Sequence, residues 1–284
     1  LVTPFRPDYA IDWDAYGRLV DFHLDHGTNG LVPCGCTGEA ATLTHEEQMD
    51  AIRFVHERVA GRVPVIAGTG SNNTAEAIRL TKHAAEIGCD GALVITPYYN
   101  KPTPAGQLAH YTRLADECGI DIMLYNVPGR TGTKMSAATI AKLGAHPRIV
   151  SVKEAANDLD QVSDLRALSD INIMSGDDSL TLPMLSVGAS GVVSVTANIA
   201  PALMSGMCAA ANAGDFERAR ALHFQLLPLF RALFVETNPI PLKAAMARLG
   251  LCENVLRLPL TPALPESLPV VEAALDAAGL AAVA

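Results

Sequence analysis

Short apolar runs, rich in β-branched residues, recur along the 284-residue chain and limit its possible folds more than any other feature. We expect eight strands from them: "LVTP", "GLVPCGC", "VPVIAGTG", "GALVITP", "DIMLYNV", "RIVSVKEA", "INIMSG" and "GVVSV", beginning near residues 1, 30, 63, 91, 121, 148, 171 and 191. Runs this apolar are typical of strands covered on both faces, as in parallel sheets.

Segments with helical periodicity fill most of the gaps between these runs. In the segment 44–61, Thr44 and Glu47 have the spacing of a capping box, and Gly61 marks the expected end of a helix. The segment 73–88 likewise has an apolar stripe and ends at a glycine. Strands that alternate with helices predict an α/β fold with a parallel sheet.

Eight strand–helix units spread over about 200 residues fit a (β/α)8 barrel. A doubly wound sheet is the alternative, but no G-x-G-x-x-G motif opens a helix, which disfavours a dinucleotide-binding domain. From Ala200 onward the pattern is helical. We therefore expect a barrel over 1–220 and a C-terminal helical region over 221–284 that packs on it. The chain begins within its first apolar run, so we expect a truncated first strand, and a removed targeting segment stays open.

Composition and charge narrow the function. The net charge of −9 disfavours nucleic acid as a partner, because nucleic acids select basic surfaces. The sequence contains no run of roughly 18 uncharged apolar residues, so we expect no transmembrane helix. The six cysteines are scattered without a C-x-x-C pair, which indicates small buried thiols in a reducing compartment, so we expect a cytoplasmic protein.

The carboxyl ends of barrel strands, where such folds place their chemistry, collect an unusual set of side chains. We expect one rim to carry Cys36, Thr37, Tyr98, Tyr99, Tyr125, Arg130, Lys153, Gly176 and Val193. No cluster of histidine and carboxylate residues of the metal-ligand type accompanies them, so we expect a mechanism without a metal.

Lys153 ends an apolar strand, where burial penalises the charge of its ammonium group. Burial and a nearby cation both favour the neutral amine, which attacks a carbonyl to form a Schiff base. The protonated imine then withdraws electrons and acidifies the adjacent carbon. The structural alternative, in which Lys153 pairs with Glu154 or another carboxylate, stays open at this point.

Three companions of this lysine also have two interpretations. Tyr125 is either a rim aromatic or a proton shuttle. Arg130 is either a solvated loop charge or a bidentate ligand for a carboxylate. Thr37 either caps the helix that follows or takes part in the chemistry. Their shared position at one rim favours chemistry.

Seven motifs, spread over the whole chain, carry a family resemblance: "VIAGTGSNNTAEAI", "TPYYNKP", "YNVPGRTG", "VKEA", "SGDD", "GVVSVTAN" and "ETNPIPLK". With them the sequence resembles the dihydrodipicolinate synthase / N-acetylneuraminate lyase family of pyruvate-dependent Schiff-base aldolases. "YNVPGRTG" favours the synthase branch, because sibling aldolases usually lack an arginine at the position of Arg130.

The resemblance implies an activity without a cofactor, the condensation of pyruvate with L-aspartate 4-semialdehyde in lysine and diaminopimelate biosynthesis. Lys153 would form the Schiff base with pyruvate, and Tyr125 would shuttle protons. Thr37 would bind the pyruvate carboxylate, and Arg130 the carboxylate of the semialdehyde.

The resemblance also implies an assembly, a homotetramer built as a dimer of tight dimers. Tyr99 would enter the neighbouring subunit's site across the tight interface. Gly176 and Val193 would line the pyruvate pocket. Cys36 departs from the family, which usually has a threonine there that relays protons between the two tyrosines. A thiol is the weaker hydrogen-bonding group, so we expect a relay that works at a lower rate.

Feedback inhibition by L-lysine at the dimer interface is a further implication. The matching positions are Ala41, His45, Asn72, Glu76 and Tyr98. Gln48 stands where some lysine-sensitive enzymes have a histidine. The alternative is that these polar residues only cap helices and bridge subunits.

Two other functions remain as alternatives. One is a sibling aldolase or dehydratase that joins pyruvate to another aldehyde, against which Arg130 argues. The other is a catalytically silent paralogue that only binds a keto acid or an amino acid, which only the departure at Cys36 supports.

Overall fold

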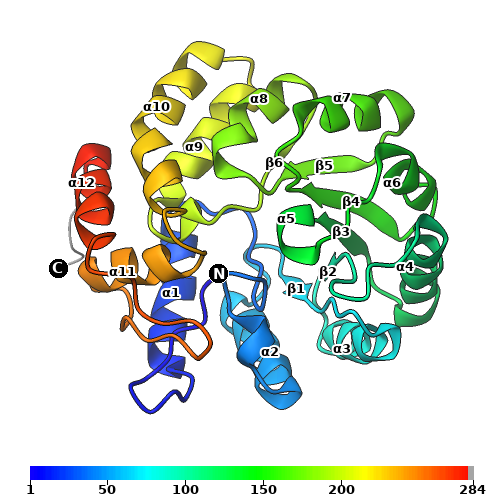
Figure 1. Ribbon diagram of the computed structural model, residues 1–284, viewed down its shortest axis with the longest axis horizontal. Helices are drawn as coiled ribbons and strands as arrows, with labels where there is room; N and C mark the ends of the chain where they lie inside the picture. The colour runs from blue at the N-terminus through cyan, green and yellow to red at the C-terminus, as the bar shows by residue number, and fades with distance from the viewer. Residues whose placement is uncertain (281–284) are drawn as a thin grey trace. The chain divides into compact units, whose positions relative to one another are not determined.

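The computed structural model describes residues 1–280 (Figure 1). These residues divide into two compact units. One unit comprises residues 64–193. The other combines residues 1–63 with the chain from residue 194 onward. Each unit has its own buried apolar residues, and each is described by itself below.

A six-stranded parallel sheet forms the centre of the unit 64–193. Its strands follow one another in the order of the sequence: β1 (Ile66–Gly68), β2 (Gly91–Ile95), β3 (Ile122–Asn126), β4 (Ile149–Glu154), β5 (Asn172–Ser175) and β6 (Gly191–Val192). Parallel neighbours need a crossover connection, and helices supply it between successive strands. Leu93, Val94, Leu124 and Val152 are almost completely buried, which confirms the prediction of strands covered on both faces.

The helices of this unit are α3 (Thr74–Glu86), α4 (Pro104–Cys118), α5 (Pro128–Thr131), α6 (Ala137–Leu143), α7 (Leu159–Leu168), η2 (Asp178–Leu180) and α8 (Thr181–Ser186). Helices α3, α4, α6 and α7 run along the outside of the sheet, and the short α5 lies on its inner side (Figure 1). The side chains of Asn73, Thr103, Ser136 and Asp158 cap the longer ones by accepting a backbone N–H from the first turn.

The other unit is helical. It contains α1 (Trp13–Asp25), η1 (Ala40–Thr42), α2 (His45–Val59), η3 (Thr196–Asn198), α9 (Pro201–Asn212), α10 (Phe216–Ala232), α11 (Ile240–Arg248) and α12 (Leu268–Ala278). The predicted capping box is confirmed: Thr44 Oγ1 accepts the Glu47 N–H at 3.1 Å, and Glu47 Oε2 accepts the Thr44 N–H at 2.9 Å. Residue 220, the predicted boundary of the C-terminal region, lies within α10, and this domain division stays a prediction.

The first two predicted strands differ from the prediction, because neither forms a regular strand. Val2 and Leu31 are buried as expected, but the Val2 N–H donates to Asn198 Oδ1 at 3.0 Å rather than to a neighbouring strand. Each run contains a proline, Pro4 or Pro33, which has no N–H to donate to a sheet ladder. No helix within residues 1–280 is both long enough and apolar enough to span a bilayer.

Candidate active site

Lys153 and Tyr125 face one another at the carboxyl ends of two neighbouring strands. The register of the sheet pairs Tyr125 of β3 with Lys153 of β4. The Lys153 Nζ lies 4.4 Å from the centre of the Tyr125 ring. Tyr125 is buried with 6% of its surface exposed, and Lys153 is half-buried. The amine therefore lies over the ring of a buried tyrosine, in a position that is partly shielded from water.

Thr96, which follows β2, fixes the backbone of Tyr125. Its N–H and its Oγ1 both donate to the Tyr125 carbonyl oxygen, each at 2.9 Å. Thr96 is completely buried, so both bonds are shielded from water. The end of β2 thus sets the position of the ring that Lys153 approaches.

Gly176, directly after β5, lies against the Lys153 side chain. A Cβ built at Gly176 would lie 2.6 Å from the Ala155 Cβ and 3.0 Å from the Lys153 Cε, closer than a side chain tolerates. Only glycine lets the backbone pass this close to the lysine. Val193 follows β6, and its N–H donates to the Ser175 carbonyl oxygen at 2.8 Å. Of the predicted rim, the structure thus brings Lys153, Tyr125 and Gly176 together and places Val193 at the end of the next strand.

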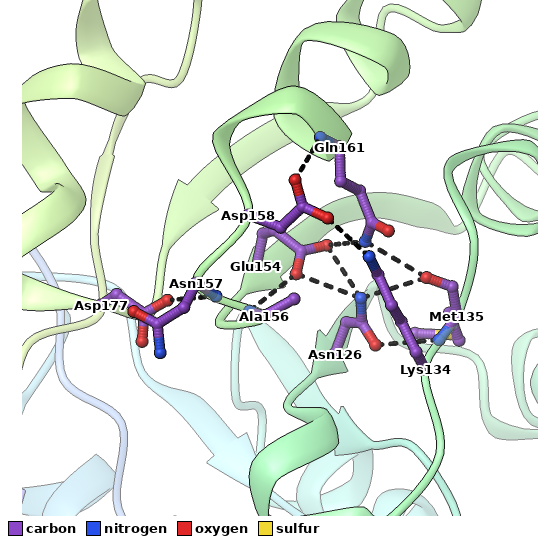
Figure 2. Close-up of polar contacts among 9 residues, drawn as sticks. All are labelled: Asn126, Lys134, Met135, Glu154, Ala156, Asn157, Asp158, Gln161 and Asp177. Carbon is purple, nitrogen blue, oxygen red and sulfur yellow. Dashed lines mark hydrogen bonds and ion pairs between the residues drawn. The ribbon is translucent and has the colours of Figure 1, made fainter.

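Asp177 adds a carboxylate near Lys153. Sequence reasoning missed Asp177, although it belongs to the motif "SGDD". Burial raises the pKa of Asp177, while the Asn157 N–H, which donates to Asp177 Oδ2 at 3.0 Å, and the charge of Lys153 lower it. Figure 2 shows the contact between Asn157 and Asp177. The strand-end signal that selected Gly176 applies equally to this neighbour.

Glu154, the first of the carboxylates that the structural alternative offered as a partner, does not face Lys153. Successive side chains of a strand point to opposite faces, so Glu154 lies on the other face of β4 from Lys153. Its carboxylate accepts hydrogen bonds from Asn126, Gln161 and the Ala156 N–H (Figure 2). Burial raises the pKa of Glu154 to about 7, and these three donors oppose the shift.

Arg130, Tyr98 and Tyr99 are exposed. Arg130 lies in the short helix α5, which follows β3 directly. Tyr98 and Tyr99 lie between β2 and α4, where Tyr99 is 90% exposed and has a left-handed backbone conformation with φ of 70°. The role of Tyr99 in a neighbouring subunit stays a prediction.

Thr37 and Cys36 belong to the other unit, where they lie in a turn between residue 31 and η1. Thr37 caps neither of the next two helices, because their N-cap residues are Glu39 and Thr44. Instead, the Thr37 Oγ1 accepts a hydrogen bond from Asn238 Nδ2 at 2.9 Å. A hydroxyl that accepts here keeps its own proton for donation to another group. The Cys36 carbonyl oxygen accepts the Glu39 N–H at 3.1 Å, which closes the turn.

A buried ion pair holds the end of this turn. The Lys243 Nζ lies 2.5 Å from Glu39 Oε1 and donates to the Val255 carbonyl oxygen at 2.7 Å. The side chains of Lys243 and Glu39 are 0% and 1% exposed. Sequence reasoning missed this pair, because its members are more than 200 residues apart and no periodicity links them.

The five residues expected to bind L-lysine lie in both units. Ala41 is exposed in η1, and His45 is the first residue of α2. In the other unit, the Asn72 carbonyl oxygen accepts from Asn100 Nδ2 at 2.8 Å, and Glu76 lies in the first turn of α3. Their role stays a prediction. Within residues 1–280, no group of three or more histidine, cysteine, aspartate or glutamate side chains is placed to hold a metal ion.

Consecutive parallel strands that carry reactive side chains at their carboxyl ends define the class, a β/α-barrel enzyme. The family model for the dihydrodipicolinate synthetase family matches residues 1–278, and the chain belongs to this family. It is 54% identical over 283 residues to the 4-hydroxy-tetrahydrodipicolinate synthase of Maridesulfovibrio salexigens, an alignment that covers 99% of this chain and 97% of the relative.

Solved structures confirm the predicted (β/α)8 barrel with C-terminal helices. The dihydrodipicolinate synthase of Aquifex aeolicus is similar with a TM-score of 0.97 and 46% identity, over 100% of this chain and 98% of that one. The chloride-inhibited dihydrodipicolinate synthase of Acinetobacter baumannii, solved in complex with pyruvate, is similar with a TM-score of 0.97 and 43% identity, over 99% of this chain and 97% of that one.

Proposed function

We propose that this protein condenses pyruvate with L-aspartate 4-semialdehyde, the 4-hydroxy-tetrahydrodipicolinate synthase reaction of lysine and diaminopimelate biosynthesis. The observation that carries the proposal is the pairing of Lys153 with Tyr125 at the carboxyl ends of β3 and β4. The family of the chain and its 54% identity to a synthase of this name support the choice of reaction.

The first half of the reaction joins pyruvate to the enzyme. The neutral amine of Lys153 attacks the ketone carbon of pyruvate, and the adduct loses water to give an imine. Tyr125 moves the protons, since its ring lies next to the amine. Thr37 binds the pyruvate carboxylate through its hydroxyl and backbone N–H, and Asn238 orients that hydroxyl. Gly176 and Val193 line the space that pyruvate occupies.

The second half forms the carbon–carbon bond. The protonated imine withdraws electrons, so the pyruvate methyl carbon loses a proton and an enamine forms. This carbon attacks the aldehyde of the semialdehyde, whose oxygen gains a proton and becomes a hydroxyl. The amine of the semialdehyde then attacks the imine carbon, closes the ring and displaces Lys153. Arg130 binds the carboxylate of the semialdehyde, and Cys36 relays protons between Tyr125 and Tyr99.

The assembly that we propose is a cytoplasmic homotetramer, a dimer of tight dimers in which each Tyr99 enters a neighbouring site. The 90% exposure of Tyr99 supports this role, because an aromatic ring so exposed is available to a partner. In each subunit, we propose a barrel over 1–220 and a C-terminal helical region over 221–284.

L-Lysine is the proposed feedback inhibitor. It binds at the interface of the tight dimer to the five matching residues: Ala41, His45, Asn72, Glu76 and Tyr98. The Glu76 carboxylate pairs with an ammonium group of the inhibitor. A titration with L-lysine tests this proposal, and activity that stays constant up to millimolar L-lysine contradicts it.

Turnover of the two substrates tests the proposed reaction. NADPH consumption by an added downstream reductase reports product formation, and we expect a signal that Lys153→Ala abolishes. No signal from folded wild-type protein, with the reductase verified, contradicts the reaction. In that case, pyruvate with a panel of other aldehydes identifies a sibling aldolase, and no turnover with any of them identifies a silent paralogue.

A further inference from the structure

The side chain of Asn126 connects the two ends of the loop 127–135, which carries Arg130. Asn126, the last residue of β3, accepts the Met135 N–H on its Oδ1 at 3.0 Å and donates from its Nδ2 to the Met135 carbonyl oxygen at 3.2 Å. Both backbone polar groups of Met135 thus bind the residue from which the loop departs (Figure 2). The loop is closed at its base by one buried amide.

Glu154 of β4 binds this amide, and Gln161 of α7 binds both Glu154 and Met135. Asn126 Nδ2 lies 3.1 and 3.0 Å from the two Glu154 carboxylate oxygens. Gln161 Nε2 donates to Glu154 Oε2 at 2.8 Å and to the Met135 carbonyl oxygen at 3.2 Å. The residues Asn126, Met135, Glu154 and Gln161 are all at least 94% buried. Hydrogen bonds shielded in this way hold the base of the loop in one arrangement.

Position 154 requires a side chain that only accepts hydrogen bonds. The Ala156 N–H donates to Glu154 Oε1 at 3.0 Å, so every neighbour described for this carboxylate is an N–H donor. A carboxylate satisfies all of them, whereas a carboxamide would turn an NH2 group toward another donor. Replacement of Glu154 by glutamine therefore keeps the size of the side chain and breaks its bonding.

We infer that Asn126, Glu154 and Gln161 are positioning residues that fix the loop 127–135 and thereby the guanidinium of Arg130, so that they determine the affinity for the carboxylate of the second substrate. The inference rests on the proposed function, which assigns that carboxylate to Arg130. Glu154 and Lys153 point to opposite faces of β4. The cluster therefore acts on the second substrate and leaves imine formation with pyruvate intact.

Steady-state kinetics of Glu154→Gln and Gln161→Met test the inference. Above pH 7, we expect the KM for L-aspartate 4-semialdehyde to rise about tenfold, equivalent to about 1.4 kcal/mol. We expect the KM for pyruvate and the rate of borohydride trapping to change by less than about twofold. Hydrogen exchange of the segment 127–135 should also become faster in both variants, because the base of the loop is loosened.

Lys134→Ala is the matched control, since it lies in the same loop and removes only an exposed ion pair, Lys134 Nζ to Asp158 Oδ2 at 2.7 Å. Its KM values should stay within about twofold of wild type. An unchanged KM for the semialdehyde in a folded variant overturns the inference, as does an equal rise in both KM values. If Glu154→Gln does not fold, Gln161→Met decides. Absence of wild-type turnover contradicts the proposed function instead. In that case, hydrogen exchange of the segment 127–135 that stays as slow in both variants as in wild type also overturns the positioning role.

Discussion

Lys153 Nζ lies 4.4 Å from the centre of the Tyr125 ring, and the two residues occupy paired positions of neighbouring parallel strands. Sheet register therefore sets their separation, without reliance on a mobile loop. The Gly176 backbone packs against the lysine from β5, so three successive strands confine the amine. A rigid frame of this kind suits a nucleophile that must meet a small carbonyl substrate in one orientation.

Gly176→Ala should lower activity strongly, because the new Cβ would lie 3.0 Å from Lys153 Cε and 2.6 Å from the Ala155 Cβ. We expect kcat to fall more than about tenfold as the lysine shifts, since displacements near 1 Å carry large penalties. Steady-state kinetics measure the effect. The control is Gly206→Ala in α9, where the new Cβ would lie 3.6 Å from Leu222 Cδ1, an ordinary contact. Equal activity of the two variants would contradict the packing argument.

Cys36→Thr should raise kcat by about two- to tenfold, a small part of what a proton-transfer group contributes. The threonine hydroxyl is a stronger donor and acceptor than the thiol, so a relay through position 36 becomes more efficient. The KM for pyruvate should change little. Parallel measurement of kcat for wild type and Cys36→Thr checks this prediction. An unchanged kcat would show that the thiol relays protons as well as the hydroxyl does.

Breaking the Glu39–Lys243 pair should lower the free energy of unfolding by about 3–5 kcal/mol, since the remaining charge is buried without its partner. Urea unfolding of Lys243→Met measures this loss. The control is Asp21→Asn, which removes an exposed ion pair with Arg58 and should cost far less, because solvent screens exposed charges. The double variant Glu39→Leu with Lys243→Met should regain part of the loss. Equal losses for the buried and the exposed pair would refute this account.

His23 should make the protein less stable in mild acid. Burial lowers the pKa of His23 from 6.5 to about 3, so between these values the unfolded chain binds a proton that the folded chain does not. Stability therefore falls as pH falls, by about 2 kcal/mol between pH 7 and 5 for this group. His23→Gln keeps a polar group near Thr28 but does not titrate. Its unfolding free energy should decline less over that range, and parallel curves for the two proteins would rule the effect out.

Local patterns predicted the strands from residue 63 onward, the capping box at Thr44 and the lysine at the end of β4, because each depends on residues close in sequence. The two runs that contain Pro4 and Pro33 matched the composition of strands but lack ladder donors, so apolar content alone overstated their regularity.

The hydrogen bonds that support the site could not be predicted from the sequence. The Glu154 carboxylate draws two of its three donors from β3 and α7, and the Thr37 hydroxyl receives one from Asn238, 201 residues away. Such contacts depend on how segments distant in sequence pack together, which no periodicity encodes.

Borohydride reduction in the presence of pyruvate tests most directly the central claim that Lys153 is the amine that binds pyruvate. Intact-mass analysis and peptide mapping of the treated protein should show one reduced pyruvyl adduct per chain, on Lys153, and Lys153→Arg should show none. Wild-type protein that remains unmodified, or an adduct on another lysine, would contradict the account.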